Sequence, residues 1–461
     1  MSHDEFIKVT RVPWRDQIGG RLVGRLRDVF DQQPKDGGDD PFTERDTRAA
    51  LETYAEFQQT DSDFGYSPLQ DPSGPRGLVV TIRPRELSRL AVDGRLIIQT
   101  SQYDRIKSWL ADQGISIETQ EDDRWGLGVS LLGLAGSDPQ ALYTAIVNES
   151  ENPTPGSDPL AMSLDDVTYE NIVLKPAPPV RPLAGGGQAG RAESLGPRPT
   201  GTGRGKGITV GVIDGGFEPA DAPKRTDGWL DNVTTVTDGY SSLTQAAPGV
   251  LDPGAGHGTF VTGVLLRHAP DAEIRQYRAV DSHGFGSSWR LMDCLMQAVD
   301  DGCQILNCSL GFEDPHLVGN PALSAALHRI RQDTDVLIVA AAGNSGTTTP
   351  MLPAAHKATV GVGGTETDLD PLVWSNRGPW VDCSTIADPV TSIYVVDPAD
   401  PGGDVNPWGT WYGTSFAAPK VTGELATLLG QQLAPDDALE HLFATSPRPP
   451  SSAYGYLLDL S

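Results

Sequence analysis

Short apolar runs alternate with amphipathic stretches through the second half of the chain. Continuous apolar runs bounded by Gly or Asp are typical of buried strands, and they occur at residues 207–214, 272–280, 304–310, 335–343 and 358–364. Helical spacing of apolar residues between these runs predicts helices at 259–268, 288–302 and 322–332, and a further buried helix within 412–430. Alternating strands and helices predict an α/β fold with a doubly wound, mostly parallel sheet flanked by helices. In such sheets, binding crevices lie beyond the carboxyl ends of the strands.

The first half has a different pattern. Residues 77–175 read as strand, helix, strand, strand, helix, strand, which predicts a small α+β domain of the split βαβ type. Residues 1–76 form a polar, acidic lead that is partly helical in pattern. Residues 176–206 are rich in Pro and Gly and have almost no large apolar side chain, which predicts a linker. Residues 207–461 then form the large α/β unit.

Charge and cysteine content exclude several kinds of partner. The 461 residues include 61 acidic and 35 basic side chains, a formal net charge of −26 that repels nucleic acid and anionic membranes. The four cysteines form no CxxC motif, and we expect reduced, buried thiols and no metal ligands. Neither a signal peptide nor a membrane span is evident in the pattern, so a cytoplasmic location is expected, with no nucleic-acid or membrane partner.

Three polar residues stand at glycine-bearing turns of the predicted crevice. Asp214 ends the first strand, His257 precedes a helix in GAGHGTF, and Ser415 lies in the first turn of a helix in YGTSFAAP. Individually, each residue type is usually a cap or a turn residue. Together they supply a nucleophile, a base that takes its proton, and a carboxylate that orients the base.

Asn344 completes the set. It follows a strand in VAAAGNSG, and although Asn at such a point usually serves a turn, its side-chain N–H₂ can also donate to an oxyanion. The backbone N–H of Ser415 and the positive end of its helix would share that negative charge.

Residues 207–461 resemble the catalytic domain of a subtilase, a subtilisin-like serine protease. VIDGG, HGTFVTG and GTSFAAPKVTG resemble the family's aspartate, histidine and serine motifs in the family's order, and AAAGN resembles its oxyanion segment. The resemblance implies that Asp214 orients His257, that His257 is the general base and acid, that Ser415 is the nucleophile, and that Asn344 donates to the oxyanion.

Two further segments resemble the family's substrate cleft, NCSLG and SHGFGSSW. They imply an extended peptide held as an added strand between two edges. The residues implied in peptide binding are Gly284, Phe285, Gly286, Ser309, Leu310 and Gly311.

Departures from the family pattern are modest. Phe260 replaces a frequent second histidine, Phe416 replaces a frequent methionine after the nucleophile, and Gly215 replaces a small hydroxyl residue after Asp214. None removes a catalytic group. The family's calcium sites cannot be placed residue by residue, so no cofactor and no metal is assigned.

The resulting hypothesis is a serine endopeptidase that cleaves protein or peptide substrates through an acyl-enzyme. Its N-terminal half is expected to act as a prodomain or as a docking module for a regulatory partner, and one of these would restrain the protease. Two alternatives use the same cleft: a peptide ligase or cyclase with the same triad, and a peptide-binding module. An α/β-hydrolase esterase and a metallopeptidase are disfavoured, because the chain has neither the G-x-S-x-G elbow at Ser415 nor an H-E-x-x-H motif.

Overall fold

The structure is a computed structural model that describes residues 78–83, 86–153, 157–169, 190–216, 225–231, 233–236, 254–280, 284–314, 319–395 and 405–461. The predicted acidic lead at 1–76 lies outside these ranges, as do residues 170–175 of the predicted α+β domain and residues 176–189 of the predicted linker.

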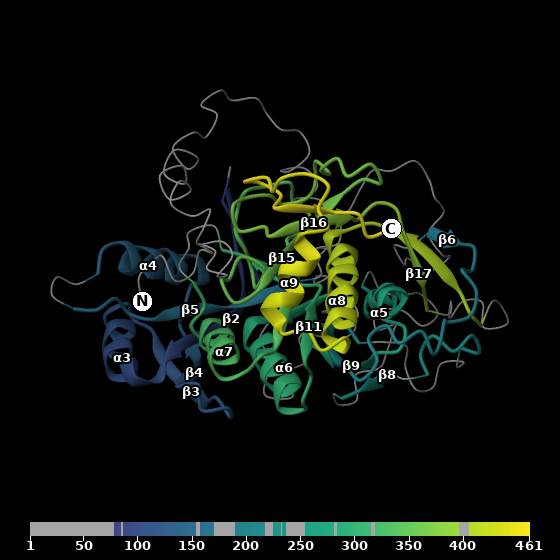
Figure 1. Ribbon diagram of the computed structural model, residues 1–461. Coiled ribbons are helices and arrows are strands. Elements are labelled where there is room, and N and C mark those ends of the chain that lie inside the picture. Colours follow the sequence, from purple (N-terminus) through teal and green to yellow (C-terminus); the bar gives the residue numbers. More distant parts are fainter. Residues whose placement is uncertain are drawn as a thin grey trace, which may run out of the picture.

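An eight-stranded parallel sheet forms the centre of the large unit (Figure 1). Its strand order is β19 (Tyr456–Leu458), β16 (Cys383–Ile386), β15 (Val360–Thr365), β13 (Leu337–Ala341), β11 (Ile305–Cys308), β7 (Thr209–Asp214), β9 (Glu273–Arg278) and β8 (Val233–Thr235). Five of these strands overlap the five predicted apolar runs. This confirms the predicted doubly wound, mostly parallel sheet.

Helices cover both faces of this sheet. One face packs against α5 (His257–His268), α8 (Thr414–Gly430) and α9 (Pro435–Phe443), and the other against α6 (Ser288–Asp300) and α7 (Pro321–Asp333). Successive residues of a strand point to opposite faces. In β13, for example, Val339 therefore packs on the α5 and α8 side, and Ile338 on the α6 and α7 side.

The N-terminal domain has two strands before its first helix, where the sequence pattern predicts one, and its later elements follow in the predicted order. It comprises β1 (Leu78–Arg83), β2 (Glu86–Gln99), the 3₁₀ turn η4 (Thr100–Gln102), α3 (Tyr103–Asp112), β3 (Ser116–Asp122), β4 (Val129–Ala135), α4 (Pro139–Glu151) and β5 (Met162–Tyr169). Its antiparallel strands follow the order β5-β2-β4-β3, with β1 paired to β2.

Strands β2 and β4 of this smaller sheet are buried on both faces. Leu96 and Leu132 pack with α3 and α4, whereas Ile97, Val129 and Leu131 belong to the core around α6 and α7 of the large unit. An apolar face shared in this way indicates that the two units pack on each other.

Strand β10 (Phe285–Ser287) of the large unit pairs with β5 and so extends the sheet of the N-terminal domain. Two small sheets complete the large unit: β12 (Phe312–Glu313) with β14 (Met351–Leu352), and β17 (Val390–Ile393) with β18 (Trp408–Trp411) and β6 (Gly190–Ala192). Because β6 pairs with β18, and Arg198 donates to the carbonyl of Pro270, residues from 190 onward pack on the large unit. This described part of the predicted linker is held on the large unit by backbone pairing and hydrogen bonds rather than by apolar burial, which composition alone does not reveal.

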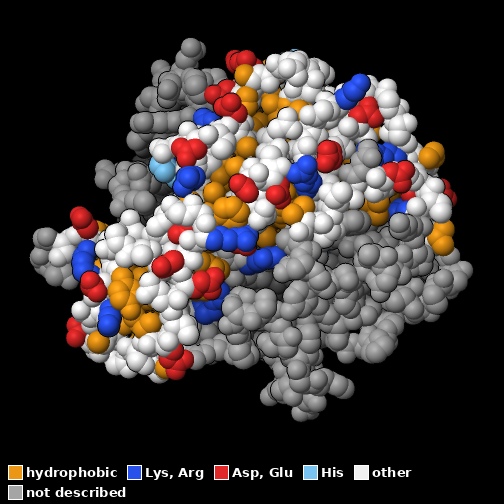
Figure 2. Space-filling view, turned by 90° about the horizontal axis from the view of Figure 1, so that it is seen from below, with side chains coloured by type: hydrophobic (Ala, Val, Ile, Leu, Met, Phe, Trp, Pro, Cys, Tyr) orange, Lys and Arg blue, Asp and Glu red, His pale blue; other side chains and the backbone are white. Residues whose placement is uncertain are grey.

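Seen from below, acidic and basic side chains are interspersed over the described surface, with hydrophobic ones scattered among them (Figure 2). Among the described helices, none is both long and apolar enough to cross a bilayer.

Candidate active site

Asp214 and His257 form a buried pair at the carboxyl end of the sheet. Nδ1 of His257 lies 2.9 and 3.1 Å from the two carboxylate oxygens of Asp214, and the side chains are 2% and 0% exposed. The pair requires α5 to begin close to the turn after β7. A β-carbon at Gly258 would lie 1.9 Å from the carbonyl oxygen of Gly216, so only glycine permits this approach.

Ser415 lies in the first turn of α8, and a proline shapes its surroundings. Pro419 has no N–H to donate to the carbonyl of Ser415, four residues earlier. The hydroxyl of Ser309 donates to that carbonyl instead, at 2.7 Å. In return, the Ser415 hydroxyl donates to the carbonyl oxygen of Ser309 at 3.1 Å. These two bonds fix the nucleophile relative to the predicted substrate-binding segment at 309–311.

Asn344 is held in a defined orientation by Thr414. Its side-chain oxygen accepts hydrogen bonds from the backbone N–H and the hydroxyl of Thr414, at 2.9 and 2.8 Å. The same hydroxyl accepts from the backbone N–H of Gly343 at 3.0 Å. Nδ2 of Asn344 therefore lies on the side of Gly413, where an added β-carbon would be 3.4 Å away. The carboxamide N–H₂ is thus placed beside the turn that carries Ser415.

The two aromatic departures from the family pattern pack on each other. The ring centroids of Phe260 and Phe416 are 4.5 Å apart, and Trp411 contacts both rings, at 5.6 and 5.1 Å. The His257 ring lies 5.2 Å from Phe416 and 5.7 Å from Trp411. Apolar rings thus surround the imidazole and link it to the residue after the nucleophile. Sequence reasoning missed Trp411, because the strand that carries it, WGTW, is only four residues long.

A buried lysine follows the nucleophile on α8. Nζ of Lys420 donates to the carbonyl of Leu460 at 2.9 Å, and burial, followed by the charge of Arg267, lowers its pKa from 10.5 to about 8. Below about pH 8 the lysine is protonated in the folded and in the unfolded protein, and its buried charge then destabilises the folded state. Between about pH 8 and 10.5 only the unfolded state keeps the proton, so the lysine's contribution to stability improves as pH rises.

We therefore expect wild-type stability, relative to a Lys420→Met variant, to improve by up to about 3 kcal/mol between pH 7 and 10.5. Denaturant unfolding at several pH values measures this difference, with both proteins carrying Ser415→Ala to prevent self-digestion. A difference between the two proteins that does not change with pH would contradict the lowered pKa.

The predicted cleft contains a strand of the N-terminal domain. The end of β5 lies between β10 and the segment 309–311. Tyr169 pairs with Phe285 on one side and with Gly311 on the other, where two backbone hydrogen bonds of 2.9 and 3.1 Å join it to Gly311. Both predicted edges, Gly284 to Gly286 and Ser309 to Gly311, are thus brought together, and β5 lies in the place expected for a peptide substrate.

Asp165 anchors β5 to the start of α6. Its carboxylate accepts from the Ser288 hydroxyl and the Trp289 N–H, at 2.9 and 3.0 Å, and pairs with Arg95 at 3.0 Å. Negative charge is favoured at a helix N-terminus, where backbone N–H groups are free to donate. Asp166 makes a second link, because Asn320 donates to it at 2.7 Å from the residue before α7.

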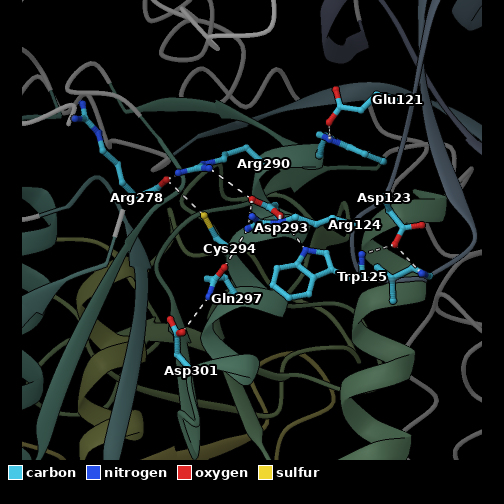
Figure 3. Close-up of polar contacts among 12 residues, drawn as sticks. Glu121, Asp123, Arg124, Trp125, Arg278, Arg290, Asp293, Cys294, Gln297 and Asp301 are labelled. Carbon is cyan, nitrogen blue, oxygen red and sulfur yellow. Dashed lines mark hydrogen bonds and ion pairs between the residues drawn. The ribbon is translucent and has the colours of Figure 1, made fainter. Parts of the chain in front are cut away.

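The hairpin loop between β3 and β4 contacts α6 nearer the middle of that helix (Figure 3). Arg124 donates to both carboxylate oxygens of Asp293 at 2.8 and 3.1 Å, and the Trp125 indole donates to the same carboxylate at 2.9 Å. Arg124 also reaches Gln297 at 3.1 Å. The N-terminal domain therefore contacts the large unit through its last strand, through its apolar sheet face and through this loop.

The four cysteines are buried, and none of them is joined to another in a disulfide. Within the part of the chain that the structure describes, no group of three or more His, Cys, Asp or Glu side chains could hold a metal ion.

The chain is similar in sequence to a family model and to known proteins. The model of the subtilase family matches residues 205–456. Thermitase of Thermoactinomyces vulgaris is 30% identical over 233 residues, which cover 50% of this chain and 76% of thermitase. A thermophilic serine proteinase of Bacillus sp. (strain AK1) is 31% identical over 187 residues, which cover 38% of this chain and 43% of that protein. The solved structure of a lanthipeptide protease matches at 22% identity with a TM-score of 0.44, covering 55% of this chain and 85% of that one.

Proposed function

Because this chain belongs to the subtilase family, we propose that it is a serine endopeptidase that hydrolyses peptide bonds through an acyl-enzyme on Ser415. The observation that carries the proposal is the buried pair of Asp214 and His257 beside a nucleophile that is hydrogen-bonded to the substrate-binding segment. If Ser415 served only as a helix cap, it would need no buried Asp214–His257 pair.

Each residue has a role that follows from its surroundings. His257 takes the proton of Ser415 as the hydroxyl attacks the scissile carbonyl and later gives it to the leaving amine, while Asp214 holds the imidazole through Nδ1. The Asn344 N–H₂, oriented by Thr414, and the Ser415 backbone N–H stabilise the oxyanion. Water then attacks the ester and releases the acid.

The substrate binds as an extended strand between β10 and residues 309–311. Main-chain hydrogen bonds of this kind provide affinity for many sequences. The pairing of Tyr169 with Gly311 supports this mode, because it uses the same backbone groups.

The N-terminal domain is the restraint on this protease. Its strand β5 occupies the cleft, so a peptide must displace it before hydrolysis. This pairing supports regulation by the chain's own N-terminal half in preference to a separate partner.

Incubation of the full chain with a short unstructured peptide tests the proposal, with Ser415→Ala as the matched control. Mass spectrometry is expected to show a new carboxylate and a new amine product with the wild type alone. Products joined to an added amine nucleophile, in place of free acid, would favour ligation. Equal turnover by both proteins would refute the role of Ser415.

A further inference from the structure

Glu313 places an unsatisfied carboxylate oxygen in the wall of the cleft. Its Oε1 has no exposed surface and no hydrogen-bond partner within the described residues. The carboxyl group is hydrogen-bonded to Ser345, the residue after Asn344, and burial raises its pKa. Buried acceptors without a partner are rare and costly, so this oxygen calls for a donor that the resting protein lacks.

The geometry of the backbone directs Glu313 to the face on which Tyr169 lies. Residues 311–313 are extended, so the side chain of Glu313 lies on the face of the strand to which a side chain at position 311 would point. Directly paired residues on antiparallel strands also share a face, and Tyr169 is paired with Gly311. The side chains of Tyr169 and Glu313 are therefore neighbours over a position that has no side chain of its own.

Two further observations support this placement. A β-carbon at Gly311 would lie 2.3 Å from the carbonyl oxygen of Leu352 and 3.0 Å from Cε of Met351, so β14 forms the floor on this face. Burial, and after it the charge of Glu313, raises the pKa of Tyr169 well above its usual value. The subsite thus has the backbone carbonyl of Leu352 and the Met351 side chain at its floor, and the Glu313 carboxyl group at one wall.

We propose that Glu313 is a specificity-determining residue, which favours a lysine or arginine side chain at the substrate position that replaces Tyr169. An ammonium or guanidinium group would donate to Oε1 and balance the buried charge, while its methylene stem would cover Met351. The inference rests on the proposed function, because it concerns the substrate of that same cleft.

The register also fixes this position relative to the scissile bond. The substrate runs antiparallel to residues 309–311. The substrate residue that pairs with Gly311 therefore lies two positions before the substrate residue opposite Ser309. The carbonyl of Ser309 accepts from the Ser415 hydroxyl, which places the reacting bond at that later residue.

A double-mutant cycle in the full chain tests the proposal without requiring activity. All proteins carry Ser415→Ala, and Tyr169→Arg is compared with the uncharged Tyr169→Met, each with Glu313 and with Glu313→Gln. When Glu313 is present, we expect the thermal midpoint of Tyr169→Arg to be about 2 °C or more above that of Tyr169→Met. With Glu313→Gln, we expect the two thermal midpoints to be equal. Tyr169→Lys repeats the test with a shorter cation.

Equal midpoints for the charged and uncharged variants, or an advantage that persists with Glu313→Gln, would overturn the proposal.

Substrate preference provides a second readout. In a chain opened by Asp165→Ala, peptides with Lys at this position are expected to be cleaved with about 10-fold higher kcat/KM than norleucine peptides, a preference that Glu313→Gln abolishes. Equal cleavage of both peptides would contradict the role of Glu313. If neither peptide is cleaved, the proposed function is refuted. The role of Glu313 is then decided by the thermal midpoints of the double-mutant cycle.

Discussion

Replacing Asp214 with asparagine is expected to lower kcat for a small peptide amide by about 10⁴-fold. Both carboxylate oxygens of Asp214 lie within 3.1 Å of Nδ1 of His257, so the carboxylate fixes the tautomer and stabilises the imidazolium that forms during attack. The asparagine amide would direct an N–H₂ group at Nδ1 or lose one of the two contacts. Steady-state hydrolysis, normalised to folded protein, measures the effect.

Asp335→Asn is the matched control, because this exposed carboxylate lies near the opposite, amino end of strand β13. It is expected to leave kcat unchanged. A fall of less than about 10-fold for Asp214→Asn would show that the pair with His257 is structural.

Replacing Asp165 with alanine is expected to raise peptide hydrolysis by the full chain at least 30-fold. Removing one partner of a buried, hydrogen-bonded charge at an interface costs about 2–5 kcal/mol, which is about 30-fold or more in the docking equilibrium. Asp165 is fully buried and serves Ser288, Trp289 and Arg95 at once. Its loss would leave Arg95, whose side chain is only 16% exposed, without this carboxylate.

The rate of hydrolysis of a small peptide by the intact chain measures this release. Asp112→Ala, an exposed change at the end of α3, is expected to leave the rate unchanged. An unchanged rate for Asp165→Ala, with both units still folded, would show that β5 does not limit access to Ser415.

Sequence reasoning predicted the parts of the fold that have a local pattern. The strands near 209–214 and 337–341 are continuous apolar runs, so they could be assigned without tertiary information. Strand β16 was missed because CSTI is short and half polar, and it is buried only through its neighbours β15 and β19. Burial of this kind depends on the fold and leaves no periodicity in the sequence.

Some residues of the candidate site could likewise be predicted from the sequence, and others could not. Asp214, His257 and Ser415 could be found because each lies within two residues of a glycine, at the end of a predicted strand or the start of a predicted helix. The occupation of the cleft by Tyr169 could not be found, because pairing between β5 and β10 joins residues more than a hundred positions apart. Likewise, the mutual packing of Phe260 and Phe416 becomes evident only once α5 and α8 lie side by side.

The most direct test is the rate and position of labelling by a serine-directed fluorophosphonate in the full chain, compared between wild type and Asp165→Ala. We predict a single adduct, mapped to Ser415, that forms at least 30-fold faster in the variant, because the nucleophile is activated and the cleft is blocked by β5. An adduct elsewhere, or equal rates of labelling in both proteins, would contradict an activated Ser415 restrained by the N-terminal domain.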